Sequence, residues 1–186
     1  MKATLWVTLV GALYGLPQLI GLLRPELWAR WLRAFPRSKI WGWILMPWAT
    51  VWFLYLLNQN AVSDFAPYKT VLLLAFGVIG FGTCFFVQDF LAVRGLAILV
   101  LLVAYYVLEA IQWLDTQWRL VITTWMYVNV VLAIWITISP WRLRDYIEWN
   151  THNLRRLRIG SAIRFVFGLV VVVIGLTAIR AAELAK

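Results

Sequence analysis

The stretch GLAILVLLVAYYVLEAIQWL at residues 95–114 decides the fold class, because its 20 residues include a single charged side chain, Glu109. A transmembrane α-helix needs about 20 predominantly apolar residues to cross the hydrocarbon core of a bilayer. Inside a bilayer, every backbone polar group must be hydrogen-bonded within the protein, and a helix achieves this within one segment. Residues 95–114 are therefore predicted to form a membrane-spanning helix.

Five further stretches have the same character, and the composition of the whole chain agrees with them. Of 186 residues, 63% are hydrophobic and 13% are charged, against roughly 25% charged in soluble domains. The net charge of +9 is better explained by basic loops facing lipid headgroups than by nucleic acid. We predict an all-α fold: one integral membrane bundle over residues 1–186 with about six spans, at 3–23, 40–57, 70–87, 95–114, 120–139 and 159–179.

The first and last spans carry features of their own. The apolar stretch of the first is too long for a signal peptide and no small-x-small cleavage site follows it, so we expect a retained helix. Pro17 is expected to kink that helix. In the last span, Arg164 has to extend toward the headgroups for the span to work. Glycine pairs such as Gly11/Gly15 and Gly168/Gly175, and the cluster around Gly80, predict close helix–helix approach.

The distribution of basic residues predicts the orientation. With six spans, twelve basic residues fall on the side of the first loop and five on the other. The positive-inside rule places the first group in the cytoplasm, so both termini are predicted to be extracytoplasmic, in a membrane of the bacterial cytoplasmic type. The inner group is Arg24, Arg30, Arg33, Arg37, Lys39, Arg94, Arg142, Arg144, Arg155, Arg156, Arg158 and Arg164; the outer group is Lys2, Lys69, Arg119, Arg180 and Lys186.

Two cytoplasmic connections have the pattern of amphipathic helices lying on the membrane surface. In residues 25–36, apolar side chains share one face and charged side chains share the other, and residues 140–158 repeat this arrangement after Pro140. Basic interfacial helices attract anionic lipid headgroups. The predicted lipid-contacting residues are Arg30, Arg33, Arg37, Arg155, Arg156 and Arg158.

The intramembrane candidates for function are Glu109, Gln112 and Asn129. An acidic side chain inside a membrane span is costly and usually faces protein, water or a partner. We predict that Glu109 faces the protein interior, with Gln112 on the same face of the helix. Three interpretations stay open: a structural contact with interfacial water or a neighbouring helix, a role in proton or ion transport, and a contact with lipid or a partner.

The stripe formed by Asp145, Glu148 and His152 is the other candidate for chemistry, since the three residues can share one helical face. It is typical of a solvated charged surface more than of a metal or acid–base site, because no second histidine exists and arginines crowd it. No nucleotide-binding, hydrolase or zinc-protease motif is present. We therefore assign no catalytic, cofactor-binding or metal-binding residue.

The sequence favours a non-enzymatic membrane protein, a subunit or scaffold that acts through helix–helix and lipid contacts. Its expected partners are membrane lipids, above all anionic headgroups on the cytoplasmic side, and other membrane subunits or further copies of itself; nucleic acid is not expected. The first alternative is a small ion- or proton-coupled transporter or channel that uses Glu109. The second is an enzyme acting on lipid headgroups at the inner surface.

Overall fold

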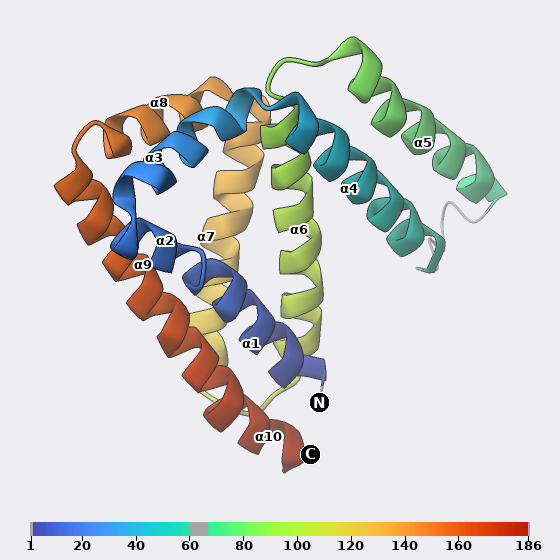
Figure 1. Cartoon of the computed structure of the whole chain (residues 1–186). Helices are drawn as coiled ribbons and strands as arrows, with labels where there is room; N and C mark the ends of the chain where they lie inside the picture. Colours follow the sequence, from blue (N-terminus) through green and yellow to red (C-terminus); the bar gives the residue numbers. More distant parts are fainter. Residues whose placement is uncertain (1, 60–66, 186) are drawn as a thin grey trace. The chain divides into compact units, whose positions relative to one another are not determined.

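The structure is a computed structural model that describes residues 2–59 and 67–185, and every regular element in these ranges is a helix. Six of the helices are long and apolar enough to cross a membrane, which confirms the predicted all-α, multi-pass architecture. Lys186, counted above among the outer basic residues, lies outside the described residues. The elements can be followed in Figure 1.

Five of the six membrane-crossing segments lie within a few residues of the predicted spans. The first consists of α1 and α2, separated at Leu16 and Pro17. Proline lacks the backbone N–H that would continue the helix, so the predicted irregularity is confirmed. These segments are α1 (Lys2–Gly15) with α2 (Gln18–Leu23), α4 (Lys39–Gln59), α5 (Lys69–Phe86), α6 (Leu91–Ile111) and α7 (Trp118–Ile138).

The sixth segment is longer than predicted. Helix α9 (Leu154–Ile174) continues through a π-helical turn (Gly175–Ile179) into α10 (Arg180–Leu184). Asn153 begins α9 as its N-cap, because its side chain accepts a hydrogen bond from the backbone N–H of Arg155 at 2.9 Å. The predicted helix over 140–158 is therefore wrong in extent. Helix α8 (Trp141–Thr151) ends before this cap, and residues 154–158 belong to α9.

The first amphipathic segment forms a short helix with the expected start. Helix α3 (Pro25–Ala34) begins at Pro25, where a proline's missing N–H is not needed, and a 3₁₀ turn (Phe35–Arg37) follows it. Its predicted apolar face is only partly exposed. A Cβ atom built on Gly21 of α2 would lie 2.8 Å from Cδ1 of Trp28, so the indole of Trp28 packs on protein.

The described residues form two compact units. Unit 1 contains those of Met1–Arg33, Val103–Leu132 and Asp145–Lys186, and unit 2 contains those of Ala34–Leu102 and Ala133–Arg144. Helices α6 and α7 each contribute to both units. Unit 1 holds the largest buried apolar cluster, formed by residues of α1, α6, α7, α9 and the π-helical turn.

In unit 1, α1 and α9 come from opposite ends of the chain and pack closely along their lengths (Figure 1). A Cβ atom added to Gly168 would lie 2.6 Å from Cα of Gly15, closer than real Cβ contacts come. One added to Gly11 would lie 3.0 Å from the carbonyl oxygen of Gly168. The close approach predicted from these glycines is confirmed, and they pack on each other.

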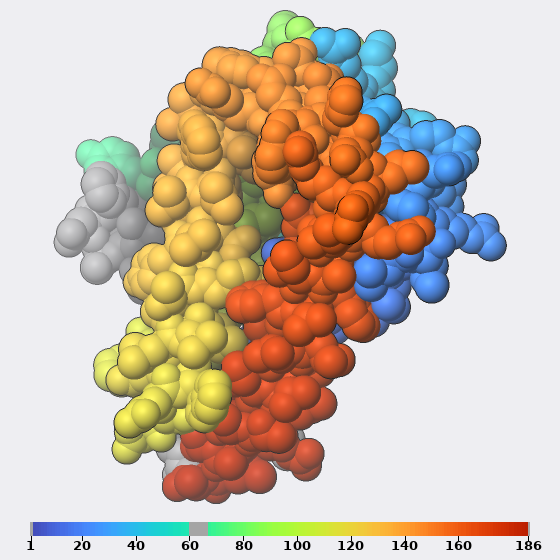
Figure 2. All heavy atoms as spheres, turned by 90° about the vertical axis from the view of Figure 1, so that its left-hand side faces the viewer, coloured from blue at the N-terminus to red at the C-terminus, as the bar shows by residue number. Residues whose placement is uncertain are grey.

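The first half of α7 lies beside α9 on the face of unit 1 that Figure 2 shows. Aromatic rings fill the contact, because Trp125 meets Phe167 edge to face with ring centroids 5.2 Å apart. Tyr14 of α1 completes the cluster at 5.2 Å from Trp125 and 6.1 Å from Phe167. Edge-to-face aromatic pairs stabilise a contact by about 0.5–1.5 kcal/mol beyond their buried area.

In unit 2, α5 packs on α4 (Figure 1). A Cβ atom on Gly80 would lie 2.5 Å from Oγ1 of Thr50, so this contact also depends on the absence of a side chain. Two edge-to-face pairs flank it, Phe53 with Phe76 and Trp43 with Phe85, each with ring centroids 5.1 Å apart.

Candidate functional site

Glu109 and Gln112 line one open groove of about 560 Å³ at the end of the α6–α7 hairpin, within unit 1. The groove is thus in the usual size range of small-molecule sites, about 300–1,000 Å³. Its wall combines charged, hydroxyl and apolar groups from both helices: Tyr105, Leu108, Glu109, Gln112, Arg119, Leu120, Thr123 and Tyr127.

The prediction that Glu109 faces the protein interior is wrong. Its side chain is exposed, whereas Ile111, two residues later, is fully buried in the core of unit 1. The helical phase explains the difference, because Val107 and Ile111 share the inner face of α6 and Glu109 lies between them in sequence, on another face. Glu109 makes no hydrogen bond or ion pair with any described residue.

Arg119 is held in place at the same groove by the backbone of the α6–α7 connection. One terminal nitrogen, Nη1, donates to the carbonyl oxygens of Gln112 at 2.9 Å and Leu114 at 3.0 Å. These contacts satisfy carbonyls near the end of α6, which have no partner within the helix. They use one nitrogen of the guanidinium, so its other N–H donors stay available to a ligand.

Asn129 is not part of this groove. Its Nδ2 donates to the carbonyl oxygen of Trp125, four residues earlier in α7, at 2.7 Å. Thr50 and Thr177 also bond the carbonyl four residues before them, at 2.9 and 2.6 Å. These groups satisfy their hydrogen-bonding needs within their own helices, as is usual for hydroxyl side chains inside helices.

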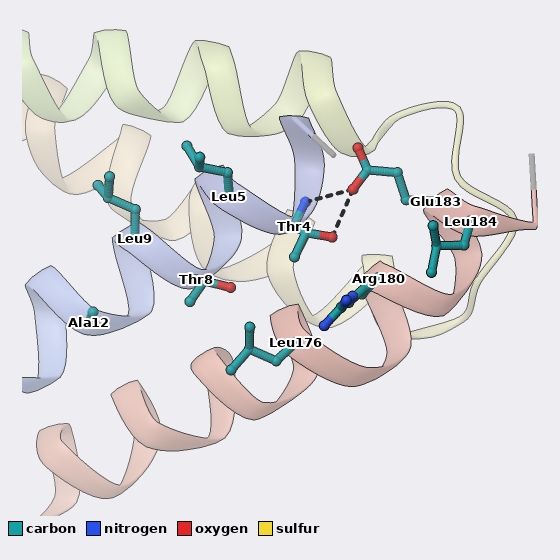
Figure 3. Close-up of a pocket in the computed structure, with 9 residues that line it drawn as sticks. All are labelled: Thr4, Leu5, Thr8, Leu9, Ala12, Leu176, Arg180, Glu183 and Leu184. Atoms are coloured by element: carbon teal, nitrogen blue, oxygen red, sulfur yellow. Dashed lines mark hydrogen bonds between the residues drawn. The ribbon is translucent and has the colours of Figure 1, made fainter.

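Sequence reasoning missed a second groove, of about 580 Å³, between the two ends of the chain (Figure 3). The π-helical turn, a rare conformation often found at functional sites, contributes one wall. Arg180 extends from α10 into the space beside α1. The lining is mainly apolar: Thr4, Leu5, Thr8, Leu9, Ala12, Leu176, Arg180, Glu183 and Leu184.

Glu183 of α10 is hydrogen-bonded to the start of α1 in this groove. Its carboxylate accepts a hydrogen bond from the backbone N–H of Ala3 at 3.2 Å. It also accepts hydrogen bonds from the backbone N–H of Thr4 at 3.2 Å and from the Thr4 hydroxyl at 2.7 Å, both drawn in Figure 3. N–H groups in the first turn of a helix have no partner within it, and a negative charge is favourable there. Glu183 thus caps α1 from the far end of the sequence.

Two of the arginines predicted to contact lipid are held by protein in unit 1. Arg33 donates through Nε to the hydroxyl of Thr151 at 2.8 Å and through Nη2 to its carbonyl oxygen at 2.7 Å, so it ties α3 to the end of α8. The guanidinium of Arg156 lies over the ring of Trp149, 4.3 Å from the centroid, and donates to the Trp149 carbonyl oxygen at 3.2 Å.

The other four differ in their surroundings. Arg37 lies over the ring of Phe90 in unit 2, at 5.9 Å from the centroid. The side chains of the remaining three are exposed and make no hydrogen bond or ion pair within residues 2–59 and 67–185, so the lipid contact stays a prediction for them: Arg30, Arg155 and Arg158.

The acidic stripe on α8 does come together with His152 in one shallow pocket, of about 390 Å³, which Trp149 and Arg156 complete. Among the described residues, no group of three histidine, cysteine, aspartate or glutamate side chains is placed to hold a metal ion.

Arg164, the charged residue in the last span, donates to the hydroxyl of Tyr146 on α8 at 2.6 Å. The side chain thus extends toward the surface helix, the direction that its cost within the bilayer favours.

The outward side of α5 differs from every packed surface described above. We define the outer face of α5 as Val71, Ala75, Val78, Ile79, Gly82 and Phe86, which lie on one side of the helix, opposite Gly80 and α4. A Cβ atom built on Gly82 meets no described atom of another element within 4 Å. The backbone at Gly82 is therefore not covered by another described helix.

No protein-family model, curated protein or solved structure matches this chain.

Proposed function

We propose that this chain is a non-enzymatic subunit of a larger membrane complex, and that a transmembrane helix of another subunit packs on the outer face of α5. The observation that carries the proposal is the uncovered Gly82. In membranes, small residues let helix backbones approach closely, and van der Waals packing and hydrogen bonds at such contacts drive association.

The other glycines of the spans show what this residue does in this protein. Gly11, Gly15, Gly80 and Gly168 each bring two helices of the chain into close contact. A Cβ atom built on Gly82, by contrast, meets no described atom of a second helix within 4 Å. A glycine inside a helix costs about 1 kcal/mol relative to alanine, so a packing role would offset its presence here.

The polar side chains of the spans support a structural role over transport. Thr50, Asn129 and Thr177 bond backbone carbonyls of their own helices, which leaves them less able to replace the hydration shell of an ion. The groove at the end of the α6–α7 hairpin and the groove between the two ends of the chain are both open at the protein surface.

Purification of the tagged, full-length chain in mild detergent tests the proposal. We expect a second membrane protein to be retained in a fixed molar ratio by the unmodified chain. It should be lost from Gly82→Leu, because a large side chain keeps the helix backbones apart. The matched control is Val166→Leu, which enlarges an exposed side chain on α9 and should retain the partner.

Three results would overturn the proposal. One is the absence of any stoichiometric partner of the unmodified chain. Another is equal retention by Gly82→Leu. The third is a retained protein that proves to be a second copy of this chain, which would replace the subunit by a homo-oligomer.

A further inference from the structure

The groove at the end of the α6–α7 hairpin holds two opposite charges that do not pair with each other. Glu109 and Arg119 both line it, yet no ion pair joins them within the described residues. Unpaired charges facing a membrane are costly unless a partner reaches them. The arrangement fits a ligand that carries both a positive and a negative group.

The depth of the charges points to a lipid headgroup. Glu109 lies two residues before the end of α6, and Arg119 is the second residue of α7, so both lie within one turn of the end of a membrane-crossing helix. That is the level of the bilayer interface. From there the groove continues along Leu108 and Tyr105 of α6 and along Thr123 and Tyr127 of α7. Tyr127 is eight residues past Arg119, about 12 Å farther along the helix.

The acceptor groups favour a primary ammonium over a quaternary one. Glu109 offers two carboxylate oxygens, and Gln112, one turn later on the same face, offers an amide oxygen. An ammonium of the R–NH₃⁺ type has three donors to match them, whereas a trimethylammonium has none. Arg119, with free N–H donors, suits the phosphate of the same molecule.

We propose that this groove binds one phospholipid with a phosphoethanolamine headgroup, its ammonium at Glu109 and Gln112 and its phosphate at Arg119. An acyl chain lies along the groove between α6 and α7, over Leu108 and against the rings of Tyr105 and Tyr127. The proposal does not depend on the one made for α5, since different residues in the other unit carry it.

Native mass spectrometry of the full-length chain, delipidated and then titrated with single lipids, tests this site. We expect one phosphatidylethanolamine to bind at least about tenfold more tightly than phosphatidylcholine or phosphatidylglycerol. Glu109→Gln should reduce the affinity for phosphatidylethanolamine about tenfold, since it removes the charge and keeps the shape. The control Asp115→Asn removes a nearby exposed charge outside the groove and should bind as the unmodified chain does.

Thermal unfolding of Glu109→Gln in lipid-free detergent checks that the variant folds, which we expect because the exposed side chain makes no hydrogen bond or ion pair with a described residue. Equal affinity of the unmodified chain and the folded Glu109→Gln variant for phosphatidylethanolamine would overturn the proposal. So would equal binding of phosphatidylcholine, which shows that no ammonium donor is recognised. Preferential binding of phosphatidylglycerol would show an anionic-lipid site built on Arg119 alone, and would overturn it as well.

Discussion

Glycines occur both in the contact between α1 and α9 and on the outer face of α5, but only those between α1 and α9 lie against a second helix. Between α1 and α9, Gly11, Gly15 and Gly168 lie against backbone atoms of the opposite helix. On α5, a Cβ atom built on Gly82 meets no described atom of another helix within 4 Å. Two helices of this chain form the α1–α9 contact, whereas no second described helix lies against Gly82. A glycine in a membrane helix therefore indicates a close approach, and the structure shows whether the chain itself supplies both helices.

The largest effect is expected where the α1–α9 contact is tightest. Gly168→Leu would place side-chain atoms inside the backbone of Gly15, whose Cα already lies 2.6 Å from a Cβ at this position. Overpacking of an unyielding contact costs about 3 kcal/mol or more, since backbone cannot move as a side chain can. Unfolding in detergent, followed by circular dichroism, measures the loss.

Val170→Leu is the control for this substitution, since Val170 is exposed on the same helix. It should unfold at the temperature of the unmodified chain. If Gly168→Leu also unfolds at the temperature of the unmodified chain, the α1–α9 contact is not as close as described.

A smaller effect is expected from the cap that joins the same two chain ends. Glu183→Ala removes the acceptor for two backbone N–H groups and one hydroxyl of α1. Loss of an N-terminal cap costs about 1–2 kcal/mol. Glu183→Gln should cost less, because an amide oxygen still accepts a hydrogen bond.

Glu109→Ala serves as the reference for this cap, measured in detergent without phosphatidylethanolamine. The exposed side chain of Glu109 makes no hydrogen bond or ion pair with a described residue, so its removal should change the unfolding free energy by less than about 0.5 kcal/mol. Equal losses for Glu183→Ala and Glu109→Ala would mean that the two carboxylates do not differ as the structure indicates.

The sequence predicts those features of the fold that depend on neighbouring residues better than those that depend on residues far apart in the chain. Spans are local, because a run of apolar residues is enough to identify one, and the six segments were predicted within a few residues except at the last. The boundary between α8 and α9 was also encoded locally, in the cap formed by Asn153, but the helical periodicity on either side of it hid the break. The glycine pattern predicted close contacts without saying which helices would meet.

The candidate sites depend on contacts that no local pattern contains. Glu183 meets Ala3 from 180 residues away, so nothing near Glu183 in the sequence marks it as a cap. Glu109 was recognised as unusual from its apolar neighbours, but the direction in which it points depends on how α6 is rotated against α1 and α7. Residues Trp6 and Tyr106, stacked with centroids 5.2 Å apart, are among the contacts that determine this rotation.

The smallest effect on stability is expected from Gly82→Leu, in contrast to the large effect expected from Gly168→Leu. Gly82→Leu should leave the unfolding free energy of the isolated chain unchanged or slightly raised, because leucine is the better helix former and no described atom of another element obstructs it. The measurement is the same unfolding experiment. A loss comparable with that of Gly168→Leu would mean that the outer face of α5 is already covered within the chain.

The most direct test of the central claim is photocrosslinking from the outer face of α5 in native membranes. A photoreactive residue at Ile79, next to Gly82 on that face, should give one adduct of defined mass with another membrane protein. The same residue at Val173, exposed on α9, should give none. Adding Gly82→Leu to the Ile79 probe should abolish the adduct. An adduct that survives Gly82→Leu, or crosslinks to lipid alone, would contradict the claim that α5 joins this chain to a partner.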